Sequence, residues 1–215
     1  MKKIIALALF CLPVLVVAEP SSLVAWTPEQ LQLVKNGNPE NGRKLAETCI
    51  GCHGENGVSA IPGYPSLAGQ SANYTFKQLR DYADDKRVNT LMSSIAQGLS
   101  EQDMTDLAAW FASQPRPQHE SSGQTFEKAE HLVFQGDSKR ILTPCFLCHG
   151  SKGQGEKMDI PALAGQQAGY FADTLKAYKS GQRHNDIYSR MRLISQQLSD
   201  QEIEQLGKYY QSLED

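Results

Sequence analysis

The chain has 215 residues, a length that allows one large domain or two small ones. Hydrophobic residues make up 40% and charged residues 21%, as in ordinary soluble proteins. The formal net charge of −3 gives no sign of the basic surface that nucleic-acid binding requires, so we expect no nucleic-acid partner.

The N-terminus predicts a secretory signal peptide over residues 1–18. It begins with a short positive stretch, continues as an almost wholly apolar run, and ends in small residues before a cleavage point after Ala18. A transmembrane anchor is the alternative, but the run is too short to span a bilayer and Pro13 interrupts it. A lipid anchor at Cys11 is a weaker third interpretation. We therefore predict an exported chain.

Helical signals follow one another along the first half of the mature chain. Residues 27–30 offer an N-cap and a first-turn proline, and residues 38–39 repeat that signal. A middle helix is predicted over 74–83, and Ser100 with Asp103 begins a further amphipathic helix. Because no run alternates with a period of two, this half is predicted to be a small all-α unit.

A polar segment over residues 115–124, rich in proline, serine and glycine, predicts a linker between two domains. It separates an N-terminal domain at 19–114 from a C-terminal domain at 125–215. The second domain repeats the helical signals of the first, with a middle helix over 170–179 and a last helix begun by Ser199.

The strongest signal is a Cys-x-x-Cys-His motif that occurs twice, at 49–53 and 145–149. Two thiols of such a motif add to the vinyl groups of a haem, and the adjacent imidazole ligates the iron. Since cleavage removes Cys11, the mature cysteines all belong to the motifs and no structural disulfide is predicted. Two covalently bound haem c groups are therefore expected, on Cys49, Cys52, Cys145 and Cys148, with His53 and His149 as iron ligands.

The two halves repeat each other. His53 and His149 lie 96 positions apart, and at this offset the Leu-Ala-Gly-Gln segment at 67–70 recurs at 163–166. Further on, the offset becomes 99, because three extra residues precede Met191 in the second copy. This pattern indicates a tandem duplication in which each half holds one haem.

The duplication also selects the second ligand of each iron. A methionine opposite the histidine gives a six-coordinate iron suited to electron transfer. Met92 and Met191 are the only methionines that match each other, and we predict them as these ligands. Met104 lies on an apolar helix face and is predicted to be core, and Met158 has no counterpart and is predicted to be a loop or packing residue. His184, seven residues before Met191, is an alternative ligand.

Two prolines, Pro65 and Pro161, each follow the motif histidine by 12 residues. A metal-bound imidazole usually donates its other N–H to a carbonyl or carboxylate, so we predict that these proline carbonyls are the acceptors. A simple turn is the alternative.

Tyrosines and arginines also match between the halves, whereas the remaining histidines do not. Tyrosines 74, 82, 170 and 178 are predicted to pack in the haem pockets. Arg87 and Arg183 could hold a haem propionate, form the domain interface or lie in solvent. His119, His131 and His184 have no partner in the other half, and we predict solvated surface positions for them.

Together these residues resemble the class I c-type cytochromes, and their tandem arrangement resembles the di-haem cytochrome c4 family. The resemblance rests on the two haem motifs with their methionines, the Pro-x-Leu-Ala-Gly-Gln segments and the Arg-x-Asn pairs at Arg87 and Arg183. It implies an all-α fold of two tandem class I cytochrome c-like domains, each wrapped around one haem. The three-residue insertion before Met191 is the local departure from that pattern.

The family resemblance also implies a function. It implies a bacterial periplasmic one-electron carrier with possible peripheral membrane association, which passes electrons from a quinol-oxidising complex towards a terminal oxidase. Its partners would be redox proteins, with no small-molecule substrate and no catalytic residue. The alternatives are a cytochrome subunit docked on a periplasmic dehydrogenase and a di-haem peroxidase, which the matched methionines argue against. A zinc protein would explain neither the methionines nor the spacing to proline.

Overall fold

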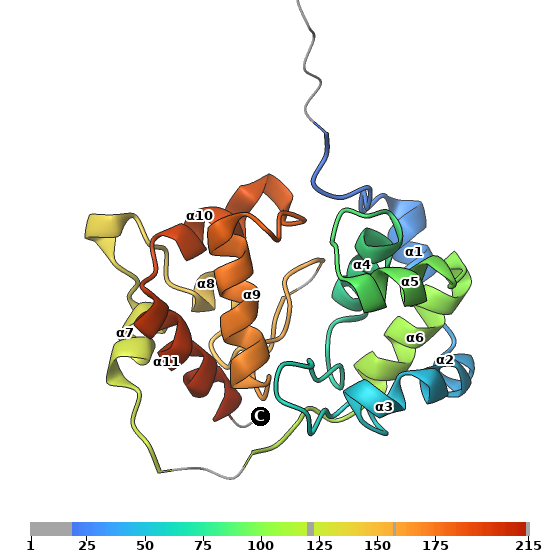
Figure 1. The fold of residues 1–215 in the computed structure, drawn as a ribbon, viewed down its shortest axis with the longest axis horizontal. Coiled ribbons are helices and arrows are strands. Elements are labelled where there is room, and N and C mark those ends of the chain that lie inside the picture. Colours follow the sequence, from blue (N-terminus) through green and yellow to red (C-terminus); the bar gives the residue numbers. More distant parts are fainter. Residues whose placement is uncertain (1–18, 120–122, 157, 214–215) are drawn as a thin grey trace, which may run out of the picture.

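The computed structural model describes residues 19–119, 123–156 and 158–213, so the predicted signal peptide lies outside the described residues. Two groups of helices stand side by side, and the chain passes between them along one edge (Figure 1). The described ranges form no strand beyond an isolated antiparallel bridge between Asp137 and Leu142. The predicted all-α fold is therefore confirmed. None of the helices in these ranges is long and apolar enough to cross a membrane.

The first half, residues 19–119, begins its helices at the capping residues that the sequence indicates. Thr27 accepts a hydrogen bond from the backbone N–H of Gln30, and Asn38 caps the next helix. Ser100 and Asp103 form a reciprocal capping box. The helices are α1 (Pro28–Lys35), α2 (Pro39–Leu45), α3 (Ile50–His53), α4 (Ala72–Ala83), α5 (Thr90–Gln97) and α6 (Glu101–Ser113), with a 3₁₀ turn at Ala46–Thr48.

The second half, from residue 123 onward, follows the same order, as the duplication predicts. Its helices are α7 (Glu127–Phe134), α8 (Phe146–His149), α9 (Ala168–Ser180), α10 (Arg190–Gln196) and α11 (Asp200–Gln211), with 3₁₀ turns at Ser138–Arg140 and Ile187–Ser189. The three-residue insertion forms the second of these turns, where Tyr188 and Ser189 adopt left-handed φ angles of 57° and 56°. Helix α10, which follows the insertion, contacts α9 as α5 contacts α4 in the first half.

Each half packs around its last helix. Helix α6 contacts α1, α2 and α4, and α11 contacts α7 and α9. Gly42 permits the close approach of α2, since a Cβ there would lie 2.0 Å from the carbonyl oxygen of Asp106. Met104 of α6 is 1% exposed and packs with Phe76, so its predicted role in the core is confirmed. The second core forms around Ile203 of α11.

The segment after α6 packs against both halves. A Cβ on Gly69 would lie 2.3 Å from Cγ of Arg116, and one on Gly165 would lie 2.4 Å from the carbonyl oxygen of Pro117. Nε2 of half-buried His119 donates to the carbonyl of Gly165 at 3.0 Å. The prediction of a solvated surface position is therefore wrong for His119, because the chain crosses from one half to the other over these two glycines.

Candidate haem sites

A single cavity of about 930 Å³ extends into both halves and is the place where the predicted site residues meet. All of the predicted attachment, ligand and carbonyl residues line it: Cys49, Cys52, His53, Pro65, Met92, Cys145, Cys148, His149, Pro161 and Met191. Met104 and Met158 do not. Residues far apart in the sequence are thus assembled into two equivalent sets, one from each half.

The short helices α3 and α8 present the thiols. The backbone N–H of Cys52 donates to the carbonyl of Cys49 at 3.2 Å, which closes one turn and puts both side chains on one face of the helix. Cys148 and Cys145 make the same contact at 3.2 Å. None of these four cysteines forms a disulfide. Burial raises the pKa of the Cys49 thiol, and it raises that of Cys145 to about 11.

The motif histidines are held in one orientation by proline carbonyls. Nδ1 of His53 lies 2.9 Å from the carbonyl oxygen of Pro65, and Nδ1 of His149 lies 3.0 Å from that of Pro161. Because a carbonyl can only accept, Nδ1 carries the proton in each ring and the lone pair of Nε2 stays free. Burial lowers the pKa of both histidines, which favours the neutral ring, although the proline carbonyls oppose this effect. A neutral imidazole is the form that ligates a metal.

A glycine fixes the loop that supplies each proline carbonyl. The carbonyl of Gly57 accepts from the backbone N–H groups of Leu67 and Ala68, and that of Gly153 accepts from the corresponding pair in the second half. Gly57 has a φ of 79° and Gly153 a φ of 67°, values in the left-handed region that favours glycine. These bonds tie the Leu-Ala-Gly-Gln segments to the loops after the haem motifs.

The two matched methionines reach the cavity from the N-terminal turns of α5 and α10. Asn89 caps α5, and its Oδ1 accepts from the backbone N–H of Met92 at 3.0 Å. Helix α10 begins after the insertion and carries Met191 as its second residue. The alternative ligand His184 is exposed and does not line the cavity.

Two repeat-related glutamines join the halves, a role that the sequence analysis did not predict. Gln70 accepts from the backbone N–H of Ala162 at 2.8 Å and donates to its carbonyl at 3.0 Å. Gln166 makes both bonds to the backbone of Ser66, each at 2.9 Å. The recurrence of Leu-Ala-Gly-Gln was the available signal, but it did not reveal that each segment binds the opposite half.

Arginine and tyrosine side chains form a second reciprocal set at this interface. Nη2 of Arg87 donates to the hydroxyl of Tyr170 at 3.1 Å, and Nη2 of Arg183 donates to that of Tyr74 at 3.0 Å. Of the three roles left open for Arg183, the structure supports the interface, since this residue is 6% exposed. All four pocket tyrosines thus line the cavity, and Tyr74 and Tyr170 also bridge the halves with their hydroxyls.

Positive charge at the interface suits a haem, which carries two carboxylates. Arg87 lines the cavity; Arg183 does not, although its Nη1 is buried with no hydrogen-bond partner among the described residues. Burial acts to raise the pKa of Tyr170, but the guanidinium groups of Arg87 and Arg183 outweigh it and bring this pKa to about 7. With the thiols, the neutral imidazoles and the apolar walls, the residues present fit one covalently attached haem in each half.

Comparisons with known proteins agree with this geometry. The family model for cytochrome c matches residues 39–115 and 137–214. Cytochrome c4 of Thiocapsa roseopersicina is 36% identical, over 82% of this chain and 93% of its own. A thiosulfate dehydrogenase electron acceptor of Stutzerimonas stutzeri is 36% identical, over 77% of this chain and 78% of its own. The crystal structure of reduced recombinant cytochrome c4 from Pseudomonas stutzeri has a TM-score of 0.79 and 33% identity, over 83% of this chain and 100% of the other.

The two haem motifs, with a cytochrome c match in each half, show that the chain carries two covalently bound haem c groups with their iron. Its relatives by sequence and by structure include cytochromes c4, which are electron-transfer proteins and not enzymes. The chain is therefore an electron-transfer protein that belongs to the di-haem cytochrome c4 family.

Proposed function

We propose that this electron carrier works with two six-coordinate irons, one held by His53 and Met92 and the other by His149 and Met191. The observation that carries this proposal is which of the methionines line the cavity. The two that the duplication pairs line it together with the histidines, whereas Met104 and Met158 do not. A methionine ligand raises the reduction potential and closes the position that a peroxidase would need open.

The chain's residues position and shield the redox centres. Each haem, when bound, supplies an iron that cycles between the ferrous and ferric states. The carbonyls of Pro65 and Pro161 keep the imidazoles oriented, so that oxidation and reduction require little movement of the protein. The apolar walls exclude water from the sites. Because both sets of residues line one cavity, electrons can pass between the halves within the protein.

We further propose a place for the carrier in a respiratory chain of the bacterial periplasm, between a quinol-oxidising complex and a terminal oxidase. A second candidate is a role as electron acceptor for a thiosulfate dehydrogenase, which the similarity to such an acceptor in Stutzerimonas stutzeri favours. Stopped-flow reduction by each purified donor separates the two. Fast reduction by the dehydrogenase alone would favour the second candidate.

Export and domain division are part of the same proposal. Residues 1–18 would be removed as a signal peptide, and Glu19 would then be the first residue, paired with Lys86 at 3.0 Å. The linker at 115–124 would join domains at 19–114 and 125–215. N-terminal sequencing of the exported protein tests the cleavage site, and limited proteolysis tests the linker. Recovery in membrane and soluble fractions at rising salt tests peripheral membrane association.

Carbon monoxide tests the ligation. It binds ferrous haem only where the sixth position is open or weakly held. We expect the reduced protein to give the spectrum of two c-type haems and no change on addition of carbon monoxide. Ready binding by either haem would reject the double His/Met assignment.

A further inference from the structure

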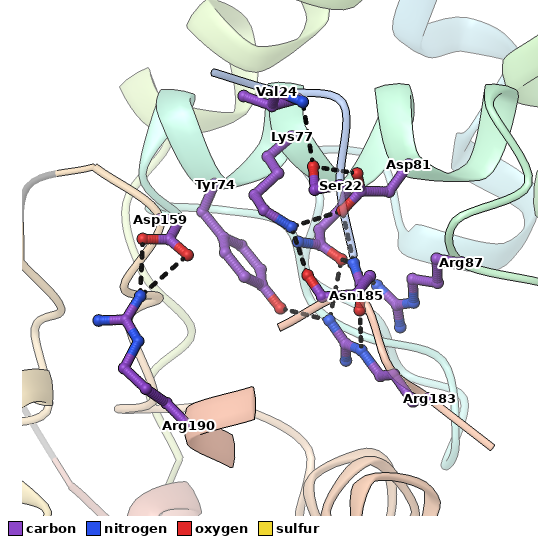
Figure 2. Close-up of polar contacts among 11 residues, drawn as sticks. Ser22, Val24, Tyr74, Lys77, Asp81, Arg87, Asp159, Arg183, Asn185 and Arg190 are labelled. Carbon is purple, nitrogen blue, oxygen red and sulfur yellow. Dashed lines mark hydrogen bonds and ion pairs between the residues drawn. The ribbon is translucent and has the colours of Figure 1, made fainter. Parts of the chain in front are cut away.

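Two asparagines that the duplication relates, Asn89 and Asn185, have different surroundings. Asn89 is exposed and caps α5, the helix that carries Met92. Asn185 is 1% exposed and contacts the first half of the molecule (Figure 2). The residue that positions the methionine helix locally in the first half therefore serves the interface in the second.

Side chains of α4 hold Asn185 at the interface. Nζ of Lys77 donates to the Asn185 carbonyl at 2.7 Å and to Asp81 at 2.5 Å. Nδ2 of Asn185 donates to Asp81 at 2.6 Å and to Oε1 of Gln78 at 3.0 Å. The side chains of Lys77 and Asp81 are only 2% and 1% exposed. Figure 2 shows this cluster with Arg183, which also donates to Gln78, at 2.8 Å.

The second half has no equivalent of the Lys77–Asp81 pair that contacts Asn185. At the repeat offset, Asp173 stands where Lys77 does and Ala177 stands where Asp81 does. Neither can make the corresponding bonds, and Asp173 is exposed. The first half therefore binds the second half through hydrogen bonds that have no repeat-related counterpart.

The capping role of Asn89 has moved to Asp186 in the second half. Oδ2 of Asp186 accepts from the backbone N–H of Arg192, in the first turn of α10, at 3.0 Å. Its Oδ1 accepts from Nε of the same arginine at 2.8 Å. Asp186 is 6% exposed and directly follows Asn185, so one fixed dipeptide contacts both the first half and the helix that carries Met191.

We propose that Lys77, Asp81 and Asn185 are positioning residues for the second haem, which hold Asp186 and thereby the start of α10 where Met191 can reach the iron. The first half thus controls the methionine of the second half, whereas Met92 depends on its own local cap. This inference rests on the proposed ligation by Met191. It makes the second iron responsive to any partner that shifts the two halves relative to each other.

The test replaces Lys77→Met and Asp81→Leu together, which removes the ion pair without leaving one charge buried alone. The readouts are carbon monoxide affinity and the upfield proton signal that the methyl group of each ligated methionine gives in the reduced protein. We expect the Met191 signal to weaken and the second haem to bind carbon monoxide about 10-fold more tightly or better. The Met92 signal should stay unchanged.

Two controls bracket this variant. Arg80→Met with Asp84→Leu removes an ion pair of the same spacing from the last turn and C-cap of α4, and should leave both methionine signals intact. Asn89→Ala removes the local cap of α5 and should weaken the Met92 signal alone. Single Met92→Ala and Met191→Ala variants assign the two signals.

Each outcome decides the proposal. A folded double variant with wild-type signals overturns it, and so does equal loss at both irons, which would indicate general destabilisation. If the double variant does not fold, Asp81→Asn keeps the shape of the cluster and should weaken the Met191 signal less, in the same direction; no change there also overturns the proposal. A wild-type protein without a Met191 signal would instead reject the ligation itself.

Discussion

Arg183 and Tyr74 connect the halves of this cytochrome through one hydrogen bond, from Nη2 to the tyrosine hydroxyl at 3.0 Å. Their repeat-related counterparts, Arg87 and Tyr170, make the same contact in the opposite direction at 3.1 Å. Each guanidinium also lies over a tyrosine ring of its own half. Cζ of Arg87 is 4.6 Å from the ring centre of Tyr82, and Cζ of Arg183 is 4.5 Å from that of Tyr178. The interface is thus built largely twice, from the same residue types, by the duplication that built the haem sites.

Replacement of Arg183→Met is expected to lower the free energy of unfolding by about 1.5–3 kcal/mol, because it leaves buried acceptors without their charged donor. Arg183→Lys should not restore the loss, since an ammonium group cannot both reach these acceptors and stack on Tyr178. Denaturant unfolding measures both variants. Arg43→Met, at an exposed ion pair with Glu40, is the control and should change stability by less than about 0.5 kcal/mol.

The buried pair on α4 makes a second prediction about stability. Lys77→Met alone should cost about 3–5 kcal/mol, because Asp81 stays buried with its charge uncompensated. The same substitution combined with Asp81→Leu should cost clearly less, because no lone charge remains. The comparison uses denaturant midpoints and slopes of the two variants. A double variant as unstable as the single one would show that the ion pair itself supports the fold.

Acid stability depends in part on Glu202. Its hydrogen bond with Arg140 and its part in the capping box of α11 lower its pKa to about 2. Because the folded-state pKa is depressed, the stabilisation is present above the unfolded-state pKa and is lost as the pH falls towards 2. Glu202→Gln should therefore flatten the dependence of stability on pH in this acidic range.

Thermal unfolding of both proteins across the acidic range provides the measurement. Glu204→Gln, at an exposed ion pair with Lys176, is the matched control and should keep the wild-type slope. A wild-type slope in the Glu202→Gln variant would contradict the assignment.

A glycine substitution tests how the first loop is held. A Cβ on Gly57 would lie 2.7 Å from Cδ1 of Phe111, at a φ of 79°. Gly57→Ala should therefore destabilise the protein by about 1–3 kcal/mol and disturb the loop that presents the Pro65 carbonyl. Gly98→Ala, where a Cβ would meet only the carbonyl oxygen of Ile95, at 3.4 Å, is the control. Calorimetry together with the spectrum of the first haem would detect the change, and equal effects of the two substitutions would contradict it.

Local patterns predicted most of the fold and the site residues because they report short-range chemistry. The caps at Thr27, Asn38 and Ser100 were visible as residue types, and helices begin there. The duplication paired Met92 with Met191 and Pro65 with Pro161, and the structure brings these residues to one cavity with the histidines. Ligation by the methionines stays a prediction.

Apart from the interface role left open for Arg87 and Arg183, the contacts between the halves were not predicted, because they depend on how the halves are placed relative to each other, which helical periodicity does not encode. Lys77 resembles a surface lysine in the sequence, yet it is 2% exposed between α4 and Asn185. His119 resembles a linker residue in solvent, yet its ring is hydrogen-bonded to the carbonyl of Gly165. The sequence does show that Lys77 and Asp81 are not repeated in the second half. Only the structure shows that this pair contacts Asn185 across the interface.

The most direct test of His/Met ligation at both irons is the number of carbon monoxide molecules that each reduced protein chain binds. We predict that wild type binds no carbon monoxide, that Met92→Ala and Met191→Ala each bind one molecule per chain, and that the double variant binds two. Binding by wild type, or a single variant that behaves as wild type, would contradict the assignment of two His/Met irons.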